Sequence, residues 1–328
     1  MNFHRGLLFW GLALVTGGAV ALAAQQGYID SHVLAGGWRL WPLILIAIGF
    51  SILGSRTPFA IVGTVVAALV VGTAGGALIA VGPAGFNCGG SDPTNLTTRQ
   101  GTFADSASVK LDFNCGTLEV AIDNPRLAVS HAWTVETGQN GGSPARITSA
   151  SDRLEVSTSN DTNWFDQGRQ RWDVMLPAAT RYSLEISPNA ADTNVNLSDG
   201  TFTLVSMHPN AGSVSLNLTD ARVDVLDLSL NAGSASIMVG HGAADISGAL
   251  SVNAGSIELC MAGAVVWRFT VEQNMTFSTN LAELGFGHDG NVWSYSPPLA
   301  PGTVYSSLDL HITGNAGRFT LNPEGGCS

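Results

Sequence analysis

Four cysteines are the residues of this sequence whose chemistry is easiest to predict. No two of them have the Cys-x-x-Cys spacing of a metal site, and no histidine stands near them in the sequence. An even number of thiols without metal spacing favours disulfides, and four cysteines allow three pairings. Two of the cysteines stand in identical Phe-Asn-Cys-Gly segments, which predicts neighbouring positions in the fold. The preferred pairing is Cys88 with Cys115 and Cys260 with Cys327.

The common motifs of catalysis and cofactor binding are missing from the sequence. It has no HExxH helix, no GxSxG nucleophile elbow and no Walker P-loop. The stretch Gly285–Gly290 matches GxGxxG, but no strand-and-helix unit surrounds it, so it predicts a loop and not a dinucleotide site. We therefore expect no metal, no cofactor and no enzymatic activity. A carbohydrate-active enzyme, with carboxylates brought together from separate segments, stays an alternative.

Aromatic and arginine side chains gather in one irregular stretch, 163–172, and a smaller aromatic cluster surrounds residue 293. Trp and Arg are enriched at binding hot spots, so these clusters are candidate surfaces for a partner. The alternative is that Trp172 and Trp293 are buried beneath irregular parts of the fold. The candidate binding residues are Trp164, Phe165, Arg169, Arg171, Trp172 and Trp293.

A repeated sequence motif indicates the fold that must position these residues. Asn-Ala-Gly-Ser occurs three times, beginning at Asn210, Asn231 and Asn253, and weaker copies precede and follow it. A fixed period of about 21 residues without a helical pattern indicates stacked repeats. Glycine and asparagine tolerate positive φ, so each copy suits a sharp corner. The predicted corners are Asn114, Asn189, Asn210, Asn231, Asn253 and Asn315, whose side-chain amides could form a ladder along the stack.

Each corner is followed by alternating apolar residues, such as Val214, Leu216 and Leu218. A period of two indicates a strand with one buried face, and one such strand cannot bury that face alone. The prediction is a β-solenoid with rungs of roughly 21 residues, irregular over 123–188 and 285–301, and closed at its ends by the disulfides. A β-sandwich whose hairpins share one turn sequence is the alternative.

Three apolar segments open the chain, at about 7–24, 38–54 and 59–81. Their lengths match the hydrocarbon thickness of a bilayer, so residues 1–83 are predicted to form an anchor of three transmembrane helices. Small residues four apart could let another helix approach closely, although Ala and Gly are simply abundant here. This stripe is Ala68, Gly72, Gly76 and Ala80.

Charge predicts where the remaining residues, 84–328, lie. Arg5 and Arg56 flank the apolar segments, whereas the loop 25–37 has no Lys or Arg, which places this second domain outside the cytoplasm. Ala21-Leu22-Ala23 resembles a signal-peptidase site, so removal of the first segment stays an alternative. The net charge is −11, and an acidic domain argues against nucleic acid as a partner.

The run Trp41-Pro42-Leu43-Ile44-Leu45-Ile46-Ala47-Ile48-Gly49, after a glycine-bearing first apolar segment, resembles the LiaI/LiaF-like transmembrane region of bacterial envelope proteins. The repeated glycine corners followed by alternating apolar residues are similar to the LiaF C-terminal domain and to the β-solenoids of candidate adhesins. The resemblance implies an envelope protein that senses or reports envelope stress. It carries over no catalytic residues.

These observations combine into a membrane-anchored all-β protein of the bacterial cell membrane, with three N-terminal helices and an extracytoplasmic β-solenoid. The first hypothesis is a sensory or regulatory envelope protein without enzymatic activity. Its partners would be the lipid bilayer, another membrane protein at the helices, and an envelope ligand or protein on the solenoid. An adhesin or structural surface protein is the second hypothesis, and a carbohydrate-active β-helix enzyme is the third.

Overall fold

The computed structural model describes residues 10–12, 14–16, 18–19, 68–72, 92–123, 131–140, 144–158, 168–240, 245–261, 265–296 and 306–323. The chain divides into two compact units, 1–91 and 92–328. The described residues before Ser91 are helical, and those after it form strands joined by turns.

The prediction of three transmembrane helices is wrong. Within the described residues, helix is confined to 10–12, 14–16, 18–19 and 68–72, and no helix there combines the length and hydrophobicity needed to cross a bilayer. The physical reason is that apolar composition and segment length show that a segment is suited to cross a bilayer as a helix, but they do not by themselves show that such a helix forms. The all-β part of the predicted fold class agrees with the structure.

Much of the predicted anchor cannot be compared with the structure. The second predicted helix, 38–54, lies outside the described residues, as does most of 7–24 and 59–81. The predicted domain boundary at 83/84 therefore stays a prediction.

Most strands of the second unit are longer than the roughly five to six residues that are usual in globular proteins. Their bounds are β1 (Leu96–Thr102), β2 (Ser106–Ile122), β3 (Ala132–Gln139), β4 (Arg146–Ala150), β5 (Arg153–Ser157), β6 (Gln170–Leu176), β7 (Arg181–Asn196), β8 (Thr201–Met207), β9 (Ala211–Leu218), β10 (Arg222–Val239), β11 (Ile246–Met261), β12 (Val265–Thr279), β13 (Gly287–Asp289), β14 (Val292–Tyr295) and β15 (Ser306–Leu321).

β10 shows how one long strand makes a rung. Its first half pairs in parallel with β8 and its second half with β9, so β8 and β9 together form the neighbouring rung. The strand bends between its halves at Gly233, whose φ is 122°. A Cβ at Gly233 would lie 2.0 Å from the carbonyl oxygen of Gly212 on the neighbouring rung. Glycine is therefore required at this corner both by the dihedral angle and by the close approach of two backbones.

Parallel pairing with the corners in register builds the stack. Ser234 lies opposite Ser213 on one side and Ser256 on the other, so the spacing of the repeated phrase is the spacing of the rungs. A sandwich made of hairpins would pair its strands antiparallel. The β-sandwich alternative is therefore excluded for these rungs.

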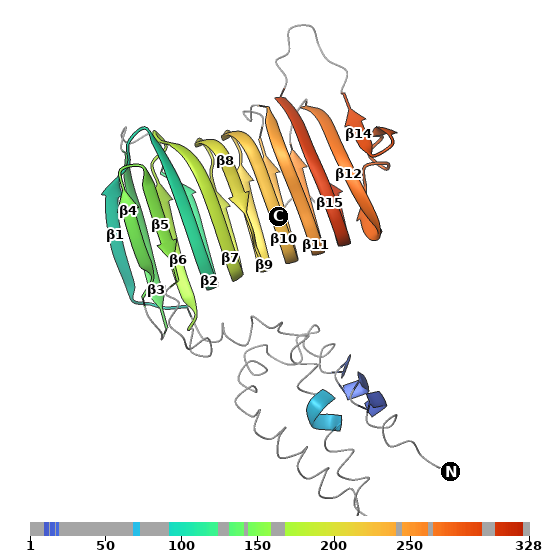
Figure 1. Cartoon of the computed structure of the whole chain (residues 1–328), viewed down its shortest axis with the longest axis horizontal. Coiled ribbons are helices and arrows are strands. Elements are labelled where there is room, and N and C mark those ends of the chain that lie inside the picture. Colours follow the sequence, from blue (N-terminus) through green and yellow to red (C-terminus); the bar gives the residue numbers. More distant parts are fainter. Residues whose placement is uncertain are drawn as a thin grey trace, which may run out of the picture. The chain divides into compact units, whose positions relative to one another are not determined.

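The stack follows sequence order in its middle and departs from it at both ends (Figure 1). β2 lies between β7 and the rung that β5 and β6 form together. β15 lies between β11 and β12. Antiparallel strands cover the end rungs, with β1, β3 and β4 at one end and β13 and β14 at the other. This matters because the end rungs of a solenoid are otherwise open edges.

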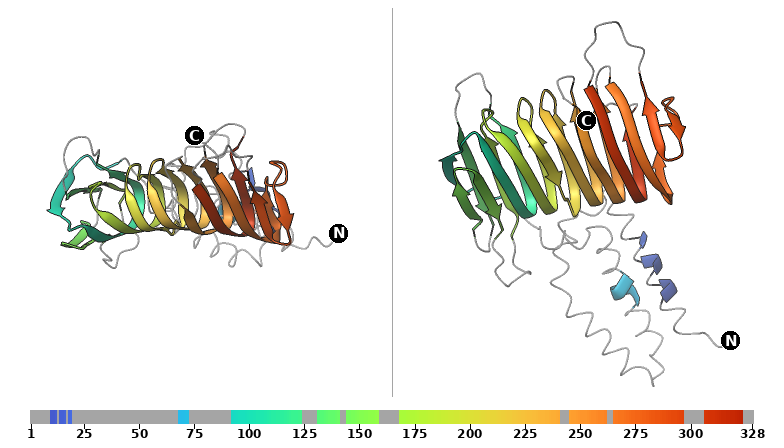
Figure 2. Two further views of the ribbon diagram at one scale, coloured as in Figure 1. Left: turned by 90° about the horizontal axis from the view of Figure 1, so that it is seen from above. Right: turned by 45° about the horizontal axis from the view of Figure 1, so that its top comes forward.

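Both halves of each rung bury side chains in one core. Val223 from the first half of β10 and Ile237 from its second half are fully buried, and the view from above shows the strands bending around this interior (Figure 2, left). Aromatic clusters fill the core near its ends. At the N-terminal end of the stack, the ring centroid of Phe103 lies 6.0 Å from those of Trp133 and Tyr182. At the C-terminal end, the ring centroid of Phe269 lies 5.7 Å from those of Trp267, Phe286 and Phe319.

Candidate functional site

The six predicted corner asparagines lie side by side along one edge of the stack. Five of the six amides donate a hydrogen bond from Nδ2 to Oδ1 of the asparagine on the neighbouring rung, so the donors all point the same way along the ladder. The bonds are Asn189 to Asn114 (3.0 Å), Asn210 to Asn189 (2.7 Å), Asn231 to Asn210 (2.6 Å), Asn253 to Asn231 (2.9 Å) and Asn315 to Asn253 (2.8 Å). Because the amides are used on one another, the ladder holds the corners together and is a poor candidate for ligand binding.

The two cysteines that the structure describes, Cys115 and Cys260, are both disulfide-bonded. They are not bonded to each other, because β2 and β11 are separated by four strand steps of about 4.8 Å each, and a disulfide needs Cα atoms within roughly 7 Å. Their predicted partners, Cys88 and Cys327, lie outside the described residues. The predicted pairing therefore stays a prediction.

The aromatic and arginine cluster does not form one binding surface. Trp172 is 1% exposed and packs edge-on against Phe113 at 4.9 Å, so it belongs to the core. Arg169 bonds to Asp92 and to the Thr117 hydroxyl. Trp164 and Phe165 lie outside the described residues.

Arg171, another member of the predicted cluster, lies beside two carboxylates. Its Nε lies 3.1 Å from Asp173 Oδ2, and a second nitrogen lies 4.0 Å from Glu119. The hydrogen bond to Asp173 raises the pKa of Arg171. Its charge is thus already opposed by two carboxylates, which leaves little unpaired charge to attract a partner.

Two residues of the small-residue stripe are described, Ala68 and Gly72, and both are buried. They share the short helical segment 68–72, one turn apart, which puts them on the same helix face. Gly76 and Ala80 lie outside the described residues, so the use of this stripe for helix packing stays a prediction.

Trp293, unlike Trp172, lies at the C-terminal end of the stack, on β14. β14 pairs antiparallel with β12, and Trp293 stands opposite Phe269. Its side chain is partly buried and packs against the core. Its ring centroid lies 4.6 Å from that of His288 on β13. The β13–β14 hairpin therefore holds an aromatic pair at the C-terminal end of the stack.

A pocket of about 610 Å³ opens beside this pair. It brings together residues from three segments, and its polar and aromatic lining consists of Glu272, His288, Asn291, Trp293, Thr313 and Asn315. Glu272 also faces His311, whose Nε2 lies 3.5 Å from the carboxylate. We define this as the C-terminal pocket. Sequence reasoning named Trp293 as a binding residue and Asn315 only as a corner. It missed His288 and Glu272, because they are isolated in the sequence and meet only through the hairpin.

The C-terminal pocket has the groups for binding, but its lining lacks a pair of carboxylates. A second hollow, a groove of about 440 Å³ across the outer face of five rungs, does have two, Asp192 and Glu258. They are three strand steps apart, which is about 14 Å. Glycosidases hold their two carboxyl groups about 5–10 Å apart. Neither hollow therefore has the arrangement of a carbohydrate-cleaving site.

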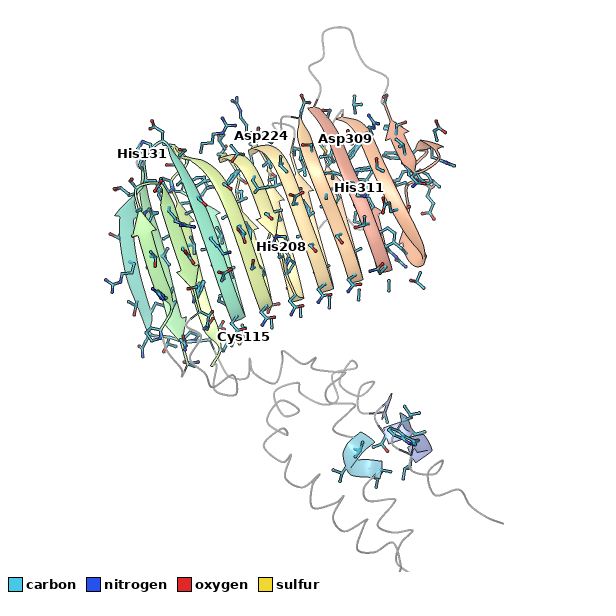
Figure 3. All side chains as sticks on the ribbon, in the orientation of Figure 1. Cys115, His131, His208, Asp224, Asp309 and His311 are labelled. Atoms are coloured by element: carbon cyan, nitrogen blue, oxygen red, sulfur yellow. The ribbon has the colours of Figure 1, made fainter. Side chains whose placement is uncertain are left out.

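Titratable groups elsewhere on the described surface are dispersed. Figure 3 shows that His131, just before β3, His208, just after β8, and His311, on β15, lie apart along the stack. No cluster of metal-binding side chains occurs among the residues that the structure describes. Asp224 at the start of β10 is paired with Arg181 at 2.7 Å.

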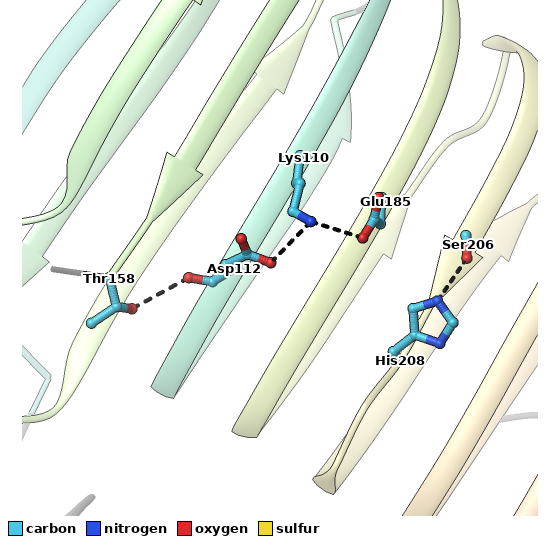
Figure 4. Close-up of polar contacts among 6 residues, drawn as sticks. All are labelled: Lys110, Asp112, Thr158, Glu185, Ser206 and His208. Atoms are coloured by element: carbon cyan, nitrogen blue, oxygen red, sulfur yellow. Dashed lines mark hydrogen bonds and ion pairs between the residues drawn. The ribbon is translucent and has the colours of Figure 1, made fainter. Parts of the chain in front are cut away.

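One ion-pair cluster lies on the outer face of the stack (Figure 4). Lys110 Nζ lies 3.1 Å from Glu185 and 4.0 Å from Asp112. The hydrogen bond to Glu185 raises the pKa of Lys110. Burial raises the pKa of Asp112, and Lys110 opposes this shift. Nearby, Ser206 and His208 are hydrogen-bonded at 3.0 Å. Sequence reasoning missed this cluster because its members come from rungs 75 residues apart.

Two family models match the chain. Residues 92–240 match the N-terminal domain of toast_rack, DUF2154, and residues 8–53 match the LiaI-LiaF-like transmembrane region. These matches confirm the resemblance to LiaI/LiaF-like envelope proteins. They support a membrane-associated envelope protein. No curated protein matches the sequence.

The comparison with solved structures gave matches of low similarity. A candidate cell-adhesion protein from Clostridium sporogenes is 12% identical, with 69% of this chain and 99% of that chain covered and a TM-score of 0.41. A candidate adhesin from Bacteroides fragilis is 11% identical, with 71% and 100% covered and a TM-score of 0.24. One from Parabacteroides merdae is 11% identical, with 70% and 98% covered and a TM-score of 0.22. Similarities of this size support no conclusion about function.

Proposed function

We propose that this chain is a non-enzymatic sensory or regulatory protein of the bacterial envelope. Its N-terminal region associates with the membrane, and its β-solenoid lies outside the cytoplasm and binds an envelope ligand or partner. The single observation that supports this most is the C-terminal pocket, where an aromatic pair, one carboxylate and the Asn291 amide meet. Concave sites with aromatic walls and a few convergent polar groups are typical of ligand binding.

Two further observations support the location. Cys115 and Cys260 are disulfide-bonded, and disulfides persist in oxidising compartments. Residues 8–53 match a transmembrane-region family. An extracytoplasmic solenoid held at the membrane is consistent with both.

The test pairs two variants on the β13–β14 hairpin. His288→Ala removes a pocket wall, whereas Asp289→Ala changes the adjacent exposed residue, which is not part of the pocket lining. With cell-wall stress as the input and a stress-response reporter as the readout, His288→Ala should lose the response and Asp289→Ala should keep it. Equal responses from both variants at equal protein levels would contradict the proposal.

A second experiment separates a sensor from an adhesin. Residues 1–91 are replaced by an unrelated membrane anchor, and both the reporter response and attachment of cells to surfaces are measured. A sensor that signals through its N-terminal region should lose the response. A protein that keeps its function with any anchor, and that changes only attachment when the solenoid is deleted, is an adhesin instead.

A further inference from the structure

We propose that the opposite, N-terminal end of the solenoid holds a second binding pocket, which takes a ligand that presents a carboxylate to Trp133 and Arg99. A pocket of about 710 Å³ opens there between the β1–β3 pair and β4. We define it as the N-terminal pocket. This volume is within the usual range for ligands of drug-like size. The proposal rests on this pocket alone and does not depend on the function proposed above.

Trp133 is the first observation. It lines the pocket, it is 2% exposed, and its buried Nε1 has no hydrogen-bond partner among the residues that the structure describes. The indole N–H is a donor only, so nothing but an acceptor can satisfy it. Buried donors without partners are rare in folded proteins because leaving them unpaired costs free energy. A ligand oxygen in the pocket would supply the missing acceptor.

The backbone fixes the indole in place. Trp133 stands directly opposite Gly101 on β1, and a Cβ at Gly101 would lie 2.4 Å from the indole ring. The absence of a side chain at Gly101 is therefore what makes room for the indole. The site around Trp133 is built into the sheet and does not depend on a loop.

Strand register brings a cation and hydroxyls to the same face. In the antiparallel β1–β3 pair, Arg99 lies opposite Val135 and Thr97 opposite Thr137. Residues two apart share a sheet face, so Arg99 and Thr97 face the same side as Trp133. Across the pocket, β4 contributes Ile147 and Ser149. The result is an apolar floor with donors around it.

The charged side chains that line the N-terminal pocket indicate which kind of ligand it would bind. None of the residues that line the N-terminal pocket is acidic, and Arg99 is their one cation, in a chain whose net charge is −11. Arg99 makes no ion pair with any described residue. One guanidinium matches one carboxylate through two parallel hydrogen bonds. Acidic sugars and the C-terminal carboxylate of a peptide share this chemistry.

The test uses the full chain in detergent micelles with ¹⁵N-labelled tryptophan. Trp133→Phe identifies the Trp133 indole resonance among those of the eight tryptophans. The probes are D-glucuronate and N-acetyl-Ala-Ala, with glucose and the amidated dipeptide as neutral controls. We expect one acid, or both, to move the Trp133 indole proton downfield with saturation, while the neutral controls leave it in place. The acid that acts identifies the source of the carboxylate.

Two arginine variants make the test specific. Arg99→Gln should weaken binding by about tenfold or more, because it removes a charge-assisted contact. Arg146→Gln is the matched control: it removes the same charge from β4, next to Ile147 but on the opposite face of that strand, and it should bind like the native chain. The proposal fails if neither acid moves the Trp133 resonance. It also fails if neutral controls move the resonance equally, or if the two arginine variants weaken binding equally.

Discussion

Asn315 donates a side-chain hydrogen bond of 2.8 Å to Asn253, although 62 residues separate the two in the sequence. The bond joins β15 to β11, with Ala316 opposite Ala254. β12, which follows β11 in the sequence, lies on the far side of β15. The strand beside β11 is therefore β15, the last strand of the chain, and not β12, the next one in sequence. β12 and the β13–β14 hairpin lie beyond β15.

The asparagine ladder should contribute measurably to stability. Asn231→Ala removes two side-chain hydrogen bonds, and we expect it to lower the free energy of unfolding by about 1–2 kcal/mol. Asn114→Ala removes one such bond and should cost about half as much. Asn194→Ala is the control, because this exposed asparagine lies in β7 outside the ladder. Chemical unfolding of the full chain measures all three. A loss for Asn231→Ala no larger than that for Asn194→Ala would show that the ladder bonds do not contribute to the free energy of unfolding.

The corner glycines should be far less replaceable than a glycine in an open turn. Gly233→Ala places a Cβ 2.0 Å from a carbonyl oxygen of the neighbouring rung, and we expect a loss of about 3 kcal/mol or more, or failure to fold. Gly290 also has positive φ, but nothing lies within 4 Å of its Cβ position. Gly290→Ala should cost about 1 kcal/mol. Thermal unfolding compares the two, and similar midpoints would contradict the close approach of the backbones.

Asp112 should make stability depend on pH. Burial raises its pKa above the usual value of 3.8, so the folded state holds this proton more tightly than the unfolded state does. The stability linked to Asp112 is thus fully present below pH 3.8 and is lost as the pH rises through the folded pKa. Asp112→Asn should therefore gain stability relative to the native chain at pH 7, and the gain should shrink toward pH 3. The gain is expected to be small because the Asp112 side chain is 40% exposed.

A second variant checks the cause of this pH dependence. Lys110 opposes the upward shift of the Asp112 pKa, so the gain from Asp112→Asn should be larger in a Lys110→Gln background. Unfolding measured across pH in the single and double variants gives the answer. A gain that does not change with pH would mean that burial does not raise the Asp112 pKa, and a gain that is smaller without Lys110 would mean that Lys110 does not oppose the shift.

The two tryptophans of the sequence-based hypothesis should behave differently. Trp172 is 1% exposed, and Trp172→Ala should cost about 3–5 kcal/mol of unfolding free energy. Trp293 is only partly buried, so Trp293→Ala should cost clearly less. Urea unfolding of the two variants provides the comparison. A larger loss at Trp293 would place that residue in the core and remove it from the proposed site.

The middle of the fold could be predicted from local signals. The Asn-Ala-Gly-Ser corners and the alternation of Val214, Leu216 and Leu218 both follow from backbone geometry, which every rung must satisfy separately. The order of rungs at the ends could not be predicted, because strand alternation states which face is buried and not which strand lies alongside. The asparagine that continues the ladder from Asn253 is Asn315, which is 62 residues later in the sequence.

The candidate site was harder to predict than the fold. Trp293 could be found because a tryptophan in a polar surface is unusual. Glu272 and His288 could not, since they meet only after the β13–β14 hairpin folds against β12. Trp172 was a misleading signal, because its polar sequence neighbours Arg171 and Asp173 form an ion pair of their own on the outer face of β6.

The location of the solenoid is the central claim, and a thiol and protease assay on intact cells tests it most directly. Cells are treated with external protease, or are blocked with maleimide, denatured without reductant and then relabelled with and without reduction. We predict that residues 92–328 are cut from outside and that Cys115 and Cys260 label only after reduction. A protected solenoid whose cysteines label without reduction would contradict the account, because it would place this unit in the cytoplasm.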